Sequence, residues 1–337
     1  MPESGEEGLS QTPTAPPRRL PGARVLVTGA GGFIASHLIE HLVTIGVRVR
    51  AFVRHRSDGH PGLLRTLPAA VFDAIEIIAG DIRDPSAVAA AVRGMEYVFH
   101  LAAEVSIPYS QLNPRESVSV NVEGTLNLLE ALRQHEIARL VHTSTSEVYG
   151  TATRPRISES HPICGQSPYA ASKIAADQLV ESYVRSFDIR AITVRPFNTY
   201  GPRQTVRAVI PTIVSQALRG GPLVLGALEP TRDFTFVTDT VRGLVRGAET
   251  EDENIGKVFN LGTGSDVSIR ALGELICSKV GCEWAVSQSP DRVRPGPSEV
   301  MRLCSDNREA RERLGWVPEI SLSDGLDRVI EAMRRVQ

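Results

Sequence analysis

The sequence predicts an α/β fold in which a doubly wound parallel sheet is covered by helices on both faces and is followed by a smaller C-terminal α/β lobe. Three observations predict it. Short runs rich in β-branched residues alternate with helical stretches between Arg24 and Pro196, and a glycine-rich turn follows the first run. The chain has 337 residues, of which 42% are hydrophobic, and this is ample for a large core.

The overall composition argues against several classes of partner. The formal net charge is -2 and charged residues make up 23%, so no global charge favours nucleic acid or an anionic membrane. No stretch approaches the roughly 20 apolar residues of a membrane span. The chain starts with an acidic, proline-rich segment that lacks the basic start and apolar run of a signal peptide. We therefore expect a cytoplasmic protein whose residues 1–20 form a disordered tail.

The four cysteines are scattered along the chain, at Cys164, Cys277, Cys282 and Cys304. Without an export signal we expect them to be reduced. Cys277 and Cys282 could lie close on one helix, but a metal site would need further ligands nearby. We expect no metal.

The predicted elements follow one another in order. Strands are expected at 23–28, 47–53, 75–81, 95–103, 138–145 and 189–196, and helices at 34–46, 120–136 and 167–187. After Pro196 the chain becomes rich in Pro and Gly, and its elements become shorter. We expect one domain over 21–196, with later returns to it near 233–262, and a smaller lobe made mainly from 197–337.

The glycine-rich turn has the context of a nucleotide-binding loop. Gly29, Gly31 and Gly32 lie between the first strand and the first helix. Glycines let the chain turn tightly and let the backbone approach a pyrophosphate, which sits at the helix N-terminus where free N–H groups point. A glycine turn without a ligand is the alternative, and the strand–loop–helix order favours binding.

This loop resembles the TGxxGxxG loop of the extended short-chain dehydrogenases, whose sheet is of the Rossmann type. Gly29 and Gly32 match, whereas Ala35 stands at the third glycine, which serves close helix–strand packing. The resemblance implies a tightly bound and recycled NAD or NADP, with a larger set of contacting residues. They are Phe33, Ile34, Arg54, Asp81, Ile82, Leu101, Ala102, Ala103, Thr143, Tyr169, Lys173 and Pro196. Simple tight packing is the alternative for the two alanines.

The end of the second strand bears on the choice of dinucleotide. A carboxylate usually holds the adenosine ribose there. This chain has Arg54 and Arg56 instead, with no carboxylate before Asp58. Because arginine suits a 2′-phosphate, we expect a slight preference for NADP, unless the arginines stack on adenine or face solvent.

Tyr169 and Lys173 are four residues apart, on one face of a predicted helix. Tyrosine alone has a pKa of about 10, and a neighbouring cation stabilises the phenolate and lowers that value. The phenolate could then take a proton from a hydroxyl while hydride leaves. The pair matches the family's catalytic motif, and Thr145 matches the hydroxyl that contacts the reacting sugar oxygen.

Glu147 narrows the reaction that the resemblance implies. Sugar-nucleotide 4,6-dehydratases have a glutamate at this position, which removes the C5 proton once C4 is a ketone. Ser146 stands where the dTDP-glucose dehydratases have an aspartate, so the source of the leaving-group proton stays open. The Thr-Ser-Glu sequence resembles the GDP-mannose and N-acetylated sugar-nucleotide dehydratases instead. A structural role for Glu147 is the alternative.

The same resemblance implies a nucleotide diphosphate sugar as substrate. Its contacts are expected from Glu104, Thr145, Asn198, Arg203, Arg232 and Arg294, with Arg292 as a further candidate. An arginine can pair with a diphosphate through its planar fork, although a solvated surface charge is the alternative for Arg292 and Arg294. A homodimer through helices near 115–134 and 167–187 is a further family expectation.

Four functions remain open at this stage. The first hypothesis is a sugar-nucleotide 4,6-dehydratase, and the second is a 4-epimerase in which Glu147 is incidental. A nucleotide-uronate decarboxylase is third. A cofactor-sensing protein without chemistry is fourth, although such proteins commonly lose the tyrosine or lysine, and both are present here.

Overall fold

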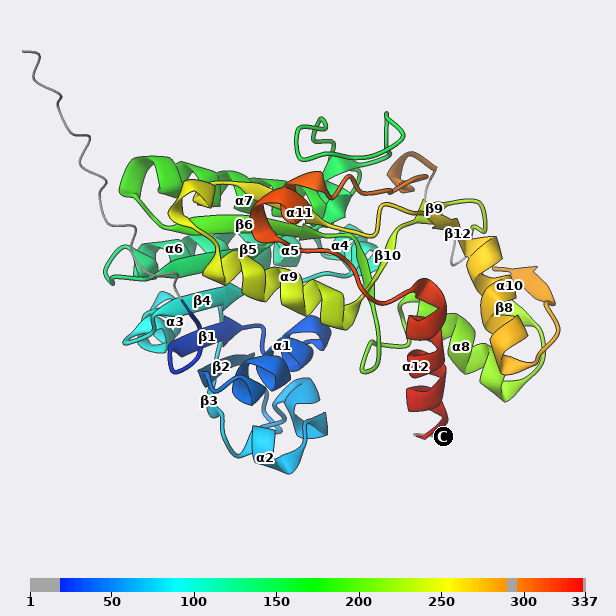
Figure 1. The fold of residues 1–337 in the computed structure, drawn as a ribbon, viewed down its shortest axis with the longest axis horizontal. Coiled ribbons are helices and arrows are strands. Elements are labelled where there is room, and N and C mark those ends of the chain that lie inside the picture. The colour runs from blue at the N-terminus through cyan, green and yellow to red at the C-terminus, as the bar shows by residue number, and fades with distance from the viewer. Residues whose placement is uncertain (1–18, 290–295, 336–337) are drawn as a thin grey trace, which may run out of the picture.

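The computed structural model describes residues 19–289 and 296–335. Its centre is a seven-stranded sheet in which every pair of neighbours is parallel (Figure 1). From one edge to the other the strands are β11 (Val258–Leu261), β6 (Ala191–Pro196), β5 (Arg139–Thr143), β4 (Tyr97–His100), β1 (Arg24–Thr28), β2 (Arg48–Arg54) and β3 (Glu76–Gly80). The predicted doubly wound parallel sheet is confirmed.

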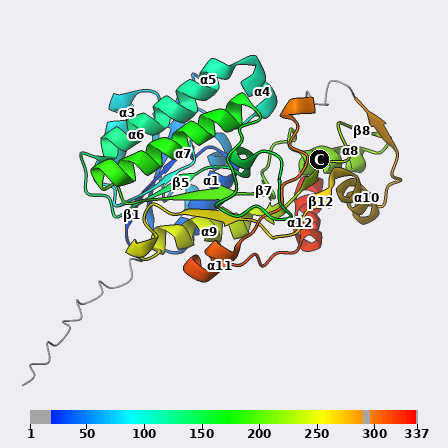
Figure 2. The ribbon, with the colours of Figure 1, turned by 90° about the horizontal axis from the view of Figure 1, so that it is seen from above.

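Helices cover both faces of this sheet (Figure 2). One face packs against α3 (Pro85–Val92), α6 (Gly124–Leu132) and α7 (Pro168–Phe187), and the other against α1 (Phe33–Thr44), α9 (Val237–Glu249) and α11 (Arg308–Leu314). Because the central strands are enclosed on both sides, β4 and β6 are buried along their whole length.

The sheet changes winding direction at β1. The chain runs from β1 to β2 and β3 on one side, and then crosses to β4 on the other side of β1. A crevice at the carboxyl ends of the strands is expected at such a switch point, because the following loops diverge there. The loops after β1, β4 and β5 therefore meet at one edge of the sheet.

The long helix expected over 120–136 is interrupted in the structure. Helix α5 (Pro114–Val118) passes into a π-helical turn over Ser119–Glu123 before α6 begins. The wider turn lets the buried Asn121 side chain donate to the Ser172 hydroxyl on α7 and to the Glu104 carbonyl oxygen. Apolar periodicity carries no signal for such a turn, which is why the sequence predicted an unbroken helix.

A smaller lobe follows the sheet, to the right in Figure 1. It contains α8 (Val209–Arg219), α10 (Ile269–Val280) and α12 (Leu322–Arg334), whose apolar faces share one core. Three short strand pairs complete it: β7 (Asn198–Tyr200) with β10 (Phe234–Phe236), β8 (Leu223–Leu225) with β13 (Val286–Gln288), and β9 (Thr231–Arg232) with β12 (Val267–Ser268).

The late part of the chain also returns to the sheet. Strand β11 pairs with β6, and α9 and α11 pack on the same face as α1. Trp316 fixes the last return, since its side chain is 2% exposed and its Nε1 donates to the Asp239 carbonyl oxygen at 2.8 Å. Within the described residues, no helix is long and apolar enough to cross a membrane.

Candidate active site

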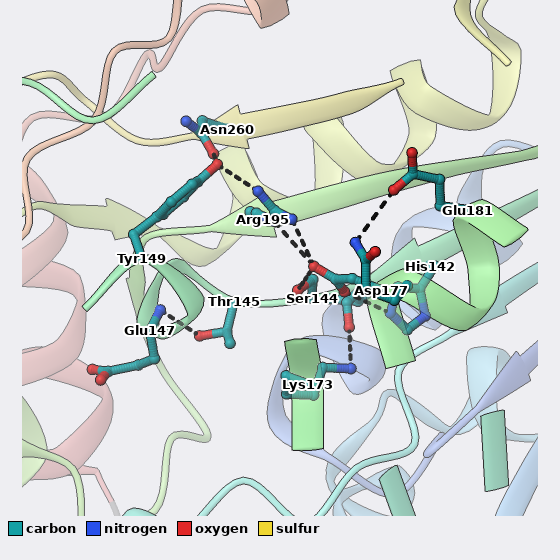
Figure 3. A network of polar contacts seen from close by, with 12 residues as sticks. His142, Ser144, Thr145, Glu147, Tyr149, Lys173, Asp177, Glu181, Arg195 and Asn260 are labelled. Atoms are coloured by element: carbon teal, nitrogen blue, oxygen red, sulfur yellow. Dashed lines mark hydrogen bonds and ion pairs between the residues drawn. The ribbon is translucent and has the colours of Figure 1, made fainter. Parts of the chain in front are cut away.

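Helix α7 brings the catalytic candidates together at the end of β5. The helix begins at Pro168, and the Ser167 hydroxyl caps it by accepting from the Ala170 N–H at 3.1 Å. Tyr169 and Lys173 are 7% and 2% exposed. A side-chain hydrogen bond with Thr145 lowers the pKa of the Tyr169 phenol. The Lys173 ammonium donates to the Thr143 carbonyl oxygen at 2.9 Å (Figure 3).

Burial dominates the electrostatics of this pair. It raises the pKa of the Tyr169 phenol, and the carboxylates of Glu147, Asp177 and Glu104 raise it further, while the hydrogen bond with Thr145 lowers it. Burial also lowers the pKa of Lys173 to about 8, against an upward influence from Asp177. At neutral pH the lysine therefore keeps its proton. Ionisation of Tyr169 depends on cations beside it, because water cannot solvate a phenolate there.

Glu147 lies beside this pair on the short helix η3 (Ser146–Tyr149). The Thr145 hydroxyl accepts from the Glu147 N–H at 3.2 Å, so a single residue contacts both Tyr169 and the start of η3. Ser146 is buried, whereas the Glu147 side chain is half-buried. In Figure 3 the Glu147 carboxylate points away from the cluster around Asp177.

The glycine loop fits a dinucleotide pyrophosphate. Gly29 has φ +68°, and a Cβ there would lie 2.7 Å from the backbone N and Cα of Ala102, so β1 and β4 approach closely at the switch point. Helix α1 follows with Gly32 as its N-cap and no side-chain cap, which leaves its first N–H groups to a ligand. Leu101 and Ala103 flank this contact, at the end of β4.

The residues expected around adenosine are partly engaged with each other. The Asp81 carboxylate accepts from the Arg83 backbone and guanidinium, and Ile82 is buried against Gly124. Arg54 is paired with Glu116 at 3.2 Å. The side chains of Arg56 and Asp58 pair at 2.9 Å. Both arginines that favoured NADP are thus already matched by carboxylates.

The residues expected to contact the substrate come from different elements of the structure. Glu104 lies beside Tyr169, with its backbone held by Asn121, and the buried Asn198 Oδ1 has no partner among the described residues. Arg232 is 8% exposed and pairs with Glu299 at 2.9 Å.

Arg203 lies elsewhere, against the cofactor helix. It has φ +68° and pairs with Glu40 and with the Ser36 hydroxyl on α1. Arg292 and Arg294 fall outside the described residues.

Sequence reasoning missed a buried polar cluster behind Lys173. Asp177 accepts hydrogen bonds from His142, Ser144 and Arg195, and all four side chains are buried. A signal was present, since Asp177 follows Lys173 by the same four residues that separate Lys173 from Tyr169. No cluster of three or more metal-binding side chains occurs in the described parts of the chain.

Comparisons with known proteins agree with this geometry. The family model described as GDP-mannose 4,6 dehydratase matches residues 26–329. A UDP-glucose 4-epimerase of Mycolicibacterium smegmatis is 35% identical over 318 residues, covering 92% of this chain and 98% of that protein. UDP-glucuronic acid decarboxylase 2 of Arabidopsis thaliana is 32% identical, covering 93% and 69%.

A solved structure shares the fold of this chain. The dTDP-glucose 4,6-dehydratase DesIV of Streptomyces venezuelae, as a double mutant with NAD bound, has a TM-score of 0.85 at 29% identity, covering 92% of this chain and 97% of that one. Relatives with three different reactions thus share this architecture.

Replacing Gly29 by alanine tests the cofactor loop. The added Cβ meets the Ala102 backbone at 2.7 Å in a left-handed conformation, so the loop must move and the affinity for NADH should fall at least about tenfold. Fluorescence titration with NADH measures it. Gly46→Ala is the matched control, since Gly46 has φ +82° but nothing within 4 Å of its Cβ position. Equal affinities in the two variants would contradict the assignment.

Proposed function

We propose that this chain, which belongs to the extended short-chain dehydrogenase family of sugar-nucleotide dehydratases and epimerases, is a sugar-nucleotide 4,6-dehydratase. The observation that carries the proposal is the position of Glu147. Its carboxylate lies close enough to the Tyr169 phenol to raise the pKa of that group, and Thr145 contacts both residues. A second base beside the first is what dehydration needs and what simple epimerisation does not use.

The residues divide the reaction between them. Tyr169 takes the proton of the sugar C4 hydroxyl, Thr145 hydrogen-bonds the same oxygen, and the Lys173 ammonium stabilises the phenolate. A nicotinamide dinucleotide held by the Gly29–Gly32 loop would supply the hydride chemistry, from C4 and back to C6, with no net redox change. Glu147 removes the C5 proton, which the C4 ketone has made acidic. Glu147 returns a proton to C5 when hydride reaches C6, so the net loss is the C4 hydroxyl proton and the C6 hydroxide, which together are one molecule of water.

We propose NAD rather than NADP as the cofactor. Solved neighbours of this chain were obtained with NAD, among them DesIV and a UDP-glucose 4-epimerase of Thermus thermophilus. The pairing of Arg54 with Glu116 and of Arg56 with Asp58 lowers the attraction of these arginines for a 2′-phosphate, and so weakens the earlier expectation of NADP.

The proposed substrate is derived from the arrangement of several side chains in the site. We propose a nucleotide diphosphate sugar whose hexose lies between Thr145, Glu147 and Glu104 and whose diphosphate pairs with Arg232. The buried Arg232 guanidinium already pairs with Glu299, so the proposal requires the diphosphate to take the place of that carboxylate on the arginine.

We also propose a homodimer through the α4–α7 surface. Large apolar side chains are exposed there on α4 (Ile107–Leu112), α5, α6 and α7, namely Leu112, Val118, Leu126 and Phe187. Their burial against a second copy would remove apolar surface from water. Light scattering should give the mass of two chains, and a monomer at working concentration would refute it.

Incubation with a panel of UDP-, GDP-, CDP- and dTDP-sugars tests the function. Mass spectrometry should show a product lighter than its substrate by one water, because hydride returns to the sugar and only water leaves. A product of unchanged mass identifies the 4-epimerase, the runner-up that the Mycolicibacterium relative favours. Loss of carbon dioxide identifies a decarboxylase. Either outcome rejects the dehydratase.

Glu147→Gln separates the two halves of the reaction. The first half needs Tyr169 and Lys173, so absorbance of the reduced cofactor should still appear on mixing with substrate. The second half needs the carboxylate, so water loss should fall by about 100-fold or more. Glu181→Gln, a change in a half-buried carboxylate of α7, is the matched control. Full turnover in Glu147→Gln would show that another group is the C5 base.

A further inference from the structure

Asp177 extends the catalytic face of α7 by one more turn. Tyr169, Lys173 and Asp177 are spaced by four residues each, so all three lie along one side of the helix. Asp177 is 4% exposed, and the proposed reaction assigns it no role. We call these three residues the α7 ladder.

Each residue of the α7 ladder forms hydrogen bonds with a different part of the segment 142–145. Tyr169 is hydrogen-bonded to the Thr145 hydroxyl, and Lys173 donates to the Thr143 carbonyl oxygen at 2.9 Å. The Asp177 carboxylate accepts from the His142 Nε2 at 3.1 Å and from the Ser144 hydroxyl at 2.8 Å. The end of β5 is therefore fixed against α7 at three successive turns.

Strand β6 supplies a charged partner of Asp177. Arg195 donates to one carboxylate oxygen through Nε at 3.1 Å and through a terminal nitrogen at 2.9 Å (Figure 3). Its other terminal nitrogen donates to the Tyr149 hydroxyl at 2.9 Å, and that hydroxyl donates to the Asn260 Oδ1 at 2.8 Å on β11. Asp177 thus joins α7 to three strands of the sheet.

The charges around Lys173 do not cancel. Lys173 influences the ionisation of His100 from β4, His142 from β5 and Asp177 from α7. Tyr169 from α7 and Arg195 from β6 complete the group, since the charge of Asp177 acts on both. Burial, helped by Lys173, lowers the pKa of His142 to about 4, and burial also holds the pKa of His100 well below its usual range, so both are neutral. Asp177 and Arg195 form an ion pair, and the charge of Asp177 still acts on both Tyr169 and Lys173.

Lys173 is thus the positive charge that this cluster leaves for the Tyr169 phenolate. Its ammonium contacts a carbonyl oxygen, and Asp177 acts on it through space. Since a negative charge favours protonation of any nearby group, Asp177 works on the tyrosine and the lysine in the same direction.

We propose that Asp177 is a positioning residue of the oxidation step, which fixes α7 on β5 and whose charge sets the proton affinity of the Tyr169–Lys173 pair. The inference rests on the proposed function only through its first step, the oxidation at C4. A purely structural carboxylate would hold the fold together without setting the ionisation of its neighbours.

The ionisation of Tyr169 gives a test that needs no substrate. The phenolate absorbance of the NAD-loaded chain is titrated with alkali, and the titration of the same chain carrying Tyr169→Phe is subtracted. Asp177→Asn removes a negative charge, so the apparent pKa of the tyrosine should fall by about one pH unit. Asp177→Glu keeps the charge and should leave that pKa near the wild-type value.

The pH profile of cofactor reduction gives a second, independent readout. The rising and falling limbs of this pH profile report the ionisation of the Tyr169–Lys173 pair. Loss of one negative charge beside the pair lowers both of its apparent pKa values. In Asp177→Asn the whole profile should therefore move to lower pH by about one unit, and Asp177→Glu should restore it. Asp252→Asn is the matched control, because Asp252 also pairs with a buried arginine, Arg139, on β5.

The outcomes separate the inference from the function. Unmoved titrations in a folded Asp177→Asn chain would overturn the inference, even if the rate had fallen. Should that variant not fold, Asp177→Glu decides: limbs at the wild-type pH support the inference, and displaced limbs contradict it. A wild-type chain that oxidises no sugar nucleotide would reject the proposed function, while the phenolate titration would still decide the role of Asp177.

Discussion

One buried ammonium group organises this site. Lys173 is 2% exposed and is held by the Thr143 carbonyl oxygen at the end of β5. An unpaired charge in such a place is costly unless hydrogen bonds and an opposite charge stabilise it. Burial lowers the pKa of Lys173 to about 8, and the charge of Asp177 acts against that lowering. The surrounding polar residues, from His142 to Asn260, hold Asp177 and Arg195 in place, and Asp177 is the group of this cluster that acts on the cation.

The parallel sheet determines which edge of the molecule carries the candidate site. All seven strands point the same way, so the loops after β1, β4 and β5 open at one edge. Gly29 and Ala102 approach there so closely that residue 29 has no room for a Cβ atom. The first N–H groups of α1 point at the same crevice. Tyr169, Thr145 and Glu147 stand at the neighbouring strand end. In the proposed function, the dinucleotide and the sugar meet at this edge, where the order of the strands places the loops.

The sequence revealed those parts of the site whose signals are local. The glycine loop, the Tyr169–Lys173 spacing and the alternation of strands and helices lie in short windows, and the sheet confirmed the expected architecture. Three features depend on distant contacts and could not be found this way. A return near 233–262 was expected, but the pairing of its strand β11 with β6, more than 60 residues earlier in the chain, was not. The π-helical turn at Ser119–Glu123 lets the Asn121 side chain reach α7. The role inferred for Asp177 depends on its contact with Arg195, which is distant in the sequence.

The central claim is that the Lys173 ammonium makes Tyr169 a base. Its most direct measurement is the single-turnover rate of cofactor reduction by substrate in Lys173→Met, compared with wild type across pH. The account predicts a rate at neutral pH lower by about 100-fold or more, recovering as the pH rises toward the ionisation of an unsupported tyrosine. A folded Lys173→Met chain that reduces its cofactor at the wild-type rate and with the wild-type pH dependence would contradict it.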